Sequence, residues 1–187
     1  DAMTRQLTDW NPYDQNASSP YFDPEWMFNV NNGFDVVIGN PPYGAEIDSD
    51  AKQQVEVSNS LDSSEYFIYK FLYYLKQHSI ISFIVPKSIV FSKKWRFSRN
   101  VILDNTLVAI SDPGLMFENV NLETFIFVLR KKHLTKNNIV KRSYFDPIKK
   151  CTPNKTLCSL LPLPQDTMRQ SDAFILSCLS DQSINII

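Results

Sequence analysis

Apolar runs alternate with helical patterns along the middle of the chain, and this alternation predicts an α/β fold. The β-branched run at residues 34–38 stops at Gly39 and predicts a buried strand. The pattern then continues as a helix, a strand, a helix and a strand, at residues 64–78, 80–85, 93–104 and 106–110. Ser63 is a candidate cap for the first of these helices, with Glu65 in its first turn.

The pattern of the C-terminal part differs from this alternation. Residues 123–130 and 139–144 predict two adjacent strands joined by a basic turn, as an antiparallel hairpin. The predicted sheet is therefore mostly parallel, with the hairpin at its edge. From residue 146 onward the pattern decays into a predicted linker, with one more helix over 171–180.

Composition narrows the class of protein. The chain has 187 residues, 43% of them hydrophobic, which is enough for one domain with a core. No apolar run approaches the length of a membrane span, so we expect no membrane partner. Three widely spaced cysteines and two histidines make a metal site improbable and suggest free thiols in a reducing cytoplasm.

Charge is distributed unevenly along the chain. Residues 1–62 carry two basic and eleven acidic side chains, whereas residues 86–155 carry fourteen basic and five acidic ones. Such an asymmetry fits a surface that meets a polyanion, and it also fits a chance segregation of surface charge. On charge alone both interpretations stay open.

Glycine is scarce, and this scarcity bears on ligand binding. The four glycines include no pair spaced to cradle a phosphate or a nucleotide, and none follows Gly114. The chain also begins at Asp1. We therefore expect a fragment of a larger protein.

The candidate chemistry lies directly after the first predicted strand, at Asn40-Pro41-Pro42-Tyr43. The two prolines exclude both strand pairing and an immediate helix, so they form a stiff loop at the carboxyl end of the strand. Open α/β sheets bind their ligands at this position. The polar segment 44–62 is expected to be a loop that flexes beside this site.

This tetrapeptide can receive a planar group that bears an amino group, such as adenine. The Asn40 side chain and the Pro41 carbonyl are two hydrogen-bond acceptors, and Tyr43 offers a flat ring. Two acceptors that take the hydrogens of an aromatic amine favour a pyramidal nitrogen, which can attack an electron-poor methyl group. The catalysis would rest on orientation and charge stabilisation.

Residues 33–44 resemble the catalytic motif of the adenine-N6 DNA methyltransferases, which use S-adenosylmethionine. With Trp10 to Asn16 and Phe22 to Phe28, the longer stretch resembles the Eco57I-type restriction–modification methylases, from about residue 9 to 145. The resemblance implies the C-terminal half of a Rossmann-like S-adenosylmethionine-dependent methyltransferase fold over residues 1–145. Residues 146–187 would then be a linker or the start of a DNA target-recognition region.

The resemblance also implies roles for individual residues. Asn40, Pro41, Pro42 and Tyr43 would be catalytic, and Tyr43 and Phe117 would hold a flipped adenine. Asn40 could also touch the cofactor, most of whose site would precede Asp1, with Asp9 and Asp23 as candidate remnants of an acidic contact. The candidates for binding DNA phosphates are the basic residues after the second strand: Lys87, Lys93, Lys94, Arg96 and Arg99.

The expected partners are double-stranded DNA and the remainder of the same polypeptide, in a bacterial or archaeal cytoplasm. Magnesium is expected only if the parent protein also carries a nuclease domain. Two alternatives remain open. The motif also serves methyltransferases of a protein glutamine or of RNA, and the chain could be a non-catalytic DNA-binding fragment. A long aromatic segment before the motif and the basic segment 86–155 favour DNA.

Overall fold

The computed structural model describes residues 11, 13–14, 22–45, 47, 62–117, 121–134, 136–145 and 157–169. The chain divides into two compact units, residues 1–33 and 34–187.

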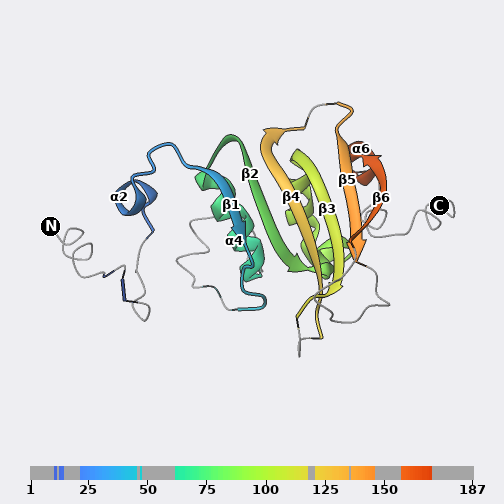
Figure 1. The fold of residues 1–187 in the computed structure, drawn as a ribbon, viewed down its shortest axis with the longest axis horizontal. Coiled ribbons are helices and arrows are strands. Elements are labelled where there is room, and N and C mark those ends of the chain that lie inside the picture. The colour runs from blue at the N-terminus through green and yellow to red at the C-terminus, as the bar shows by residue number, and fades with distance from the viewer. Residues whose placement is uncertain are drawn as a thin grey trace. The chain divides into compact units, whose positions relative to one another are not determined.

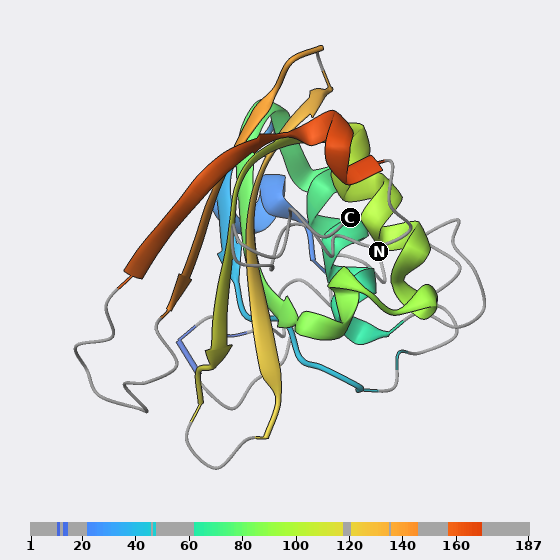
Figure 2. The ribbon, with the colours of Figure 1, turned by 90° about the vertical axis from the view of Figure 1, so that its right-hand side faces the viewer.

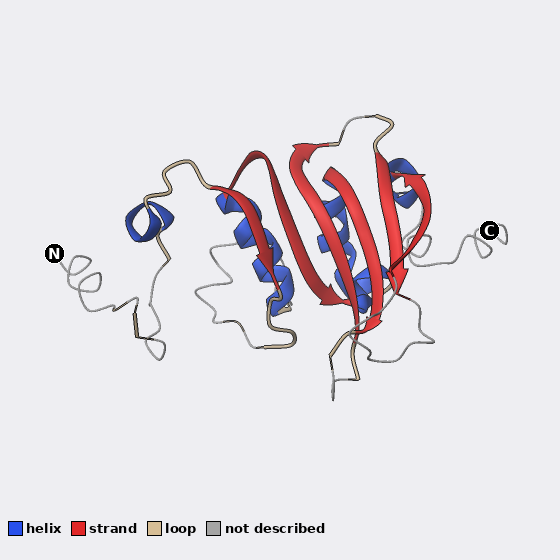
Figure 3. Ribbon diagram, viewed as in Figure 1, coloured by secondary structure: helices blue, strands red, loops and turns tan. Residues whose placement is uncertain are grey.

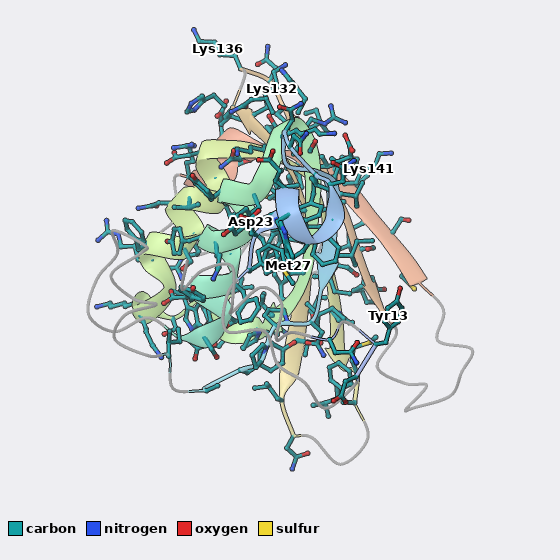
Figure 4. The ribbon with its side chains drawn as sticks, turned by 90° about the vertical axis from the view of Figure 1, so that its left-hand side faces the viewer. Tyr13, Asp23, Met27, Lys132, Lys136 and Lys141 are labelled. Carbon is teal, nitrogen blue, oxygen red and sulfur yellow. The ribbon has the colours of Figure 1, made fainter. Side chains whose placement is uncertain are left out.

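The first unit contains the short helix α2 (Pro24–Phe28). Its N-cap is Asp23, whose carboxylate accepts the backbone N–H of Trp26 at 3.1 Å, and Asn29 ends it in the left-handed conformation. The Asp23 N–H points back to the Met27 sulfur at 3.4 Å, and both residues are labelled in Figure 4. Asp23 therefore caps a helix in this structure, and Asp9 lies outside the described residues.

The second unit is built on a six-stranded sheet in the order β1-β2-β4-β3-β5-β6 (Figure 1). The strands are β1 (Phe34–Gly39), β2 (Leu75–Pro86), β3 (Asn105–Leu115), β4 (Glu123–His133), β5 (Ile139–Phe145) and β6 (Leu157–Pro164). Strands β1, β2, β3 and β5 run in one direction, and β4 and β6 run in the opposite one. The predicted α/β class, with most strands running in one direction, is confirmed.

The predicted hairpin partners are wrong. Strand β4 does not pair with β5; it lies between β2 and β3 and is antiparallel to both. Strand β5 instead pairs in parallel with β3 and antiparallel with β6. The antiparallel pair at this edge of the sheet is therefore β5–β6, and β4 is an interior strand.

Helices α4 (Ser63–Tyr74) and α5 (Arg96–Asp104) cover one face of the sheet (Figures 2 and 3). Two short 3₁₀ helices, η1 (Lys87–Val90) and η2 (Lys93–Trp95), lead from β2 into α5. The core between sheet and helices is continuous, and it includes the fully buried side chains of Phe125, Phe127, Ile68 and Ile102. This packing fixes the position of each strand end relative to α4 and α5.

Helix α4 is shorter than predicted. It ends at Tyr74, and β2 begins at once with Leu75, although the apolar spacing predicted a helix to residue 78. Phe34 and Val36 on β1 are two residues apart, but their partners on β2, Leu75 and Ile80, are five residues apart. This bulge holds His78 at a φ of 68°, in the left-handed region. A bulge leaves little trace in apolar periodicity, so the pattern extended the helix into the strand.

Part of the predicted linker is folded into the sheet. Strand β6 pairs with β5, and the short helix α6 (Gln165–Arg169) follows it. The fully buried Gln165 amide donates to the carbonyls of Leu103 and Asn105 at 3.0 and 2.7 Å and accepts from the Leu107 N–H at 2.9 Å. Residues 146–156 and the helix predicted over 171–180 lie outside the described residues.

Within the described residues, no helix is long and apolar enough to cross a membrane. The same residues include no group of three side chains that could hold a metal ion. Cys158, on β6, is a free thiol, and the other two cysteines lie outside the described residues.

Candidate functional site

The candidate site lies at one end of the strands, where the ends of β1, β2 and β3 and the start of β4 meet. Gly39 pairs with Phe83 near the ends of β1 and β2, and the end of β2 at Pro86 pairs with Thr124 at the start of β4. The end of β3 at Leu115 pairs with Glu123. The loops after β1, β2 and β3 therefore leave the sheet at the same end of its strands, which is at the bottom of Figure 1.

Gly39 brings the motif loop close to the core. A Cβ at this position would lie 3.0 Å from the Phe83 ring, which is tighter than nine in ten real Cβ contacts. Phe83 is buried and makes edge contacts with Phe71 and Phe127. Any larger residue where β1 enters the loop would have to displace the Phe83 ring, so the tight space favours glycine here.

The motif loop presents its polar groups in a defined way. Asn40 is exposed, Pro41 is buried and Tyr43 is half-buried. The Tyr43 hydroxyl donates to the Asn40 side-chain oxygen and to the backbone oxygen of Ile84 on β2, the latter at 2.9 Å. It has one proton to share between these two acceptors.

Two electrostatic features follow. Burial raises the pKa of the Tyr43 phenol, so Tyr43 is a neutral donor at neutral pH. The Asn40 oxygen has two lone pairs, so it can accept a second donor while Tyr43 is bound. No donor among the described residues bonds to the Pro41 carbonyl.

The far side of the loop is attached to the start of α4. The Ser63 hydroxyl donates to the Pro42 carbonyl at 2.7 Å and accepts from the Ala45 N–H at 3.1 Å. A carboxylate oxygen of Asp62 lies 3.5 Å from the Gly44 nitrogen, at the limit of a hydrogen bond. The sequence did not predict this attachment, because no local pattern in residues 40–63 indicates which side chain bonds to the loop.

The start of α4 is itself held firmly. Asp62, not Ser63 as predicted, is the N-cap, and it forms a reciprocal capping box with Glu65. The buried Glu65 also accepts the Ser98 hydroxyl of α5 at 2.6 Å. Burial raises the pKa of Glu65, against the opposite effect of the Ser98 hydrogen bond. The spacing of Asp62 and Glu65 is the capping-box signal that could have identified the cap.

Phe117 lies at the same edge of the sheet as the motif. It follows the end of β3, and 37% of its side chain is exposed. Strands β2 and β4 separate β1 from β3. The next residues, 118–120, lie outside the described residues. The role of Phe117 against a base stays a prediction.

Two of the five predicted phosphate-binding residues have other partners. Lys87 forms ion pairs with Asp112 at 2.9 Å and Glu123 at 3.2 Å. Burial opposes its charge, but the two carboxylates outweigh this effect and leave the pKa of Lys87 raised. Arg99 is buried, and its guanidinium donates to the carbonyls of Ile89 and Ser92 at 2.8 and 2.6 Å. These contacts give both residues a structural role.

The other three predicted phosphate-binding residues, Lys93, Lys94 and Arg96, are exposed. Lys94 lies 3.8 Å from the Asp62 carboxylate, which places it beside the start of α4. Because Asp62 also approaches Gly44, the η2 segment and the motif loop both adjoin the start of α4. Lys93, Lys94 and Arg96 remain candidates for phosphate contacts.

Other basic residues gather at the opposite end of the sheet. Lys132 and Lys136 lie where β4 ends and β5 is about to begin, and Lys141 follows on β5 (Figure 4). Lys131 in this region donates to the Tyr73 and Leu75 carbonyls at 3.3 and 2.6 Å. The basic half of the sequence therefore does not converge on one surface.

Comparisons with known proteins agree with this fold. The type IIG restriction endonuclease BpuSI matches with a TM-score of 0.56 and 18% identity, over 75% of this chain and 20% of that one. A chain of a type I restriction–modification system matches with a TM-score of 0.53 and 18% identity, over 82% and 34%. The type I methyltransferase subunit from Streptococcus thermophilus matches with a TM-score of 0.50 and 21% identity, over 65% and 28%.

The chain spans between 20% and 34% of the length of these solved structures. No curated protein matches it. One family model, described as the Eco57I restriction-modification methylase, matches residues 4–113. This range includes strand β1, the motif loop and the chain from there through helix α5. The resemblance predicted from the motif is confirmed: the chain belongs to the Eco57I restriction-modification methylase family.

Proposed function

We propose that this chain is part of a site-specific DNA methyltransferase that transfers a methyl group from S-adenosylmethionine to the N6 amino group of a flipped adenine. The observation that carries the proposal is the exposed Asn40 amide on a rigid loop at the end of β1, within the region that matches the methylase family. The Asn40 side-chain oxygen and the Pro41 carbonyl, which no donor among the described residues engages, are suited to accept the two hydrogens of one amino group.

The proposed reaction needs no tuned acid or base. The two acceptors hold the amine so that its lone pair points at the methyl carbon of the donor. S-adenosylmethionine, when bound, would supply the methyl group: the N6–carbon bond would form as the carbon–sulfur bond breaks, and S-adenosylhomocysteine would leave. The extra proton on nitrogen passes to solvent. The base must leave the helix for this attack, since its amino group is inaccessible while stacked and paired.

The residues of this chain fit only part of a donor site. Asn40 adjoins the end of β1, but the sequence has no glycine pair spaced to cradle a nucleotide. We assign no other residue to the donor.

The remainder of the donor site would lie on further polypeptide that completes the sheet beyond β1. Within the described part of the chain β1 is the end strand of the sheet, and its residues Val36 and Ile38 are 55% and 79% exposed. Among the described strands β1 pairs with β2 alone, so the backbone groups along its other side can pair with a further strand.

Tyr43 offers a first test of base binding, in the complete polypeptide that carries this chain. Y43F removes the hydroxyl that contacts Asn40 and Ile84 but keeps the ring. We expect Y43F to methylate DNA about three- to tenfold more slowly than wild type, because the ring loses the hydroxyl contacts that hold one end of it. Y43A should be about 10- to 100-fold slower, because stacking on a base contributes about 1–3 kcal/mol. Single-turnover methylation rates measure both. Equal losses in the two variants would mean that the hydroxyl, and not the ring, is what the reaction needs.

Lys93 and Lys94 offer a test of DNA binding. Each phosphate contact contributes about one unit to the slope of log affinity against log salt concentration. We expect the K93A/K94A double variant to reduce that slope by about 1–2, measured by fluorescence anisotropy with duplex DNA across salt concentrations.

K87A is the matched control for this measurement, because Lys87 is bound to Asp112 and Glu123. It should lower the melting temperature and leave the salt slope unchanged. A salt slope that falls with K87A but not with K93A/K94A would reverse the assignment.

The direct experiment is to express the complete polypeptide in a host without adenine methylation and to map methylated bases in the host DNA. N6-methyladenine at one recurring sequence supports the proposal. Unmodified DNA together with a methylated glutamine or RNA would assign the motif to another substrate.

A further inference from the structure

We propose that Ser63 is a positioning residue that sets the orientation of Tyr43 by closing the turn on which Tyr43 lies. This inference rests on the proposed function, because it concerns the same site. The Ser63 hydroxyl bonds to the Pro42 carbonyl and to the Ala45 N–H. These two groups are the first carbonyl and the last N–H of a four-residue segment.

Residues 42–45 have the features of a β-turn in which one hydroxyl group is inserted into the closing hydrogen bond. In a closed turn the first carbonyl would bond directly to the fourth N–H. Here the Ser63 oxygen lies between them, at 2.7 Å from the Pro42 oxygen and 3.1 Å from the Ala45 nitrogen. Gly44, the third residue, has a φ of +67°, as a type II turn requires. Tyr43 is then the second residue of a turn whose closing bond is relayed through α4.

The loop has few other means of fixing its own shape. Pro41 and Pro42 have no N–H, so neither can donate a backbone hydrogen bond. The Tyr43 hydroxyl holds the ring at one end, through Asn40 and Ile84. Ser63 holds the backbone at the other end. Together they define the direction of the ring.

Ser63 is itself a rigid support. Only 2% of the residue is exposed, and it is the first residue of α4, directly after the Asp62 cap. Glu65, one turn into the helix, is bound to Ser98 of α5 at 2.6 Å. A hydroxyl held this firmly can hold the turn without losing much freedom of its own.

The test uses the complete polypeptide and two readouts: the single-turnover methylation rate, and the fluorescence of duplex DNA with 2-aminopurine at the target base. S63A should slow methylation about tenfold, because a turn without its closing bond misplaces the ring. It should also raise the fluorescence of the bound DNA, because a base that is no longer stacked on Tyr43 is less quenched. S63T, which keeps a hydroxyl, should restore both values to within about threefold of wild type.

The matched control is S64A, the same change at the next position. Ser64 is fully buried, and its hydroxyl donates to Asp62 at 2.7 Å rather than to the loop. S64A should lower the melting temperature without changing the fluorescence of bound DNA. If S63A and S64A change rate and fluorescence equally, or if a folded S63T is as slow as S63A, the inference is overturned. If S63A does not fold, S63T decides alone: a wild-type fluorescence supports the inference and a raised one overturns it.

These outcomes are separate from a failure of the proposed function. A wild-type polypeptide that methylates no DNA adenine contradicts the proposed function itself. An active wild type with a normal S63A contradicts only the role of Ser63.

Discussion

Replacement of Asn40 by alanine in the complete polypeptide is expected to lower the rate of adenine methylation about 100- to 1,000-fold. That range is typical for the removal of one preorganised polar group that stabilises charge in a transition state. The Asn40 amide is exposed at the end of β1, and Tyr43 and the loop anchored at Ser63 limit its motion. The loss should fall on the single-turnover rate and leave DNA affinity within about threefold, because the amide acts chiefly on the reacting amine.

The control for this prediction is N100A, at an exposed asparagine on α5. It removes the same amide from a surface where no chemistry is proposed, so its rate should equal that of wild type. An N40A variant that methylates DNA within threefold of wild type would remove Asn40 from the mechanism.

The Q165L substitution is expected to destabilise the fold by about 3 kcal/mol. The leucine fills a similar volume, but it leaves the Leu103 and Asn105 carbonyls and the Leu107 N–H without the amide that pairs them. Asn138, whose side chain donates to the Gln165 oxygen at 2.7 Å, loses an acceptor as well. Each buried polar group left unpaired costs about 1–3 kcal/mol, and partial rearrangement recovers some of the total.

Urea unfolding and amide hydrogen exchange at Leu107 measure this effect. D166A is the matched control: it lies next to Gln165 on α6 but is exposed, so we expect a change within about 0.5 kcal/mol. If Q165L and D166A unfold at the same urea concentration, then α6 does not belong to the cooperative fold, and residues 157–169 act as the linker that the sequence predicted.

The elements could be predicted from the sequence because their signals are local. The β-branched run before Gly39 and the two prolines after Asn40 define a strand and a stiff loop without any knowledge of neighbours. The partners of the strands could not be predicted in the same way. Strand β4 is interior because it inserts between β2 and β3, and its apolar pattern would be the same beside β5.

The basic residues show the same limit. Lys87 and Arg99 have the composition of a phosphate-binding segment, but their partners come from distant strands or from the backbone of the same loop. Arg142, which is buried and donates to the Leu161 carbonyl at 2.7 Å, adds to this group. A basic side chain can meet a phosphate, a carboxylate or a carbonyl, and only the fold decides among them.

A product analysis of DNA methylated by the complete polypeptide shows directly which atom receives the methyl group. The DNA is incubated with S-adenosylmethionine labelled in its methyl group, digested to nucleosides and separated by chromatography with mass detection. We expect the label in N6-methyldeoxyadenosine with the wild-type protein and its near loss with N40A. Label in another nucleoside or in protein, or equal N6-methyldeoxyadenosine from wild type and N40A, would contradict this expectation.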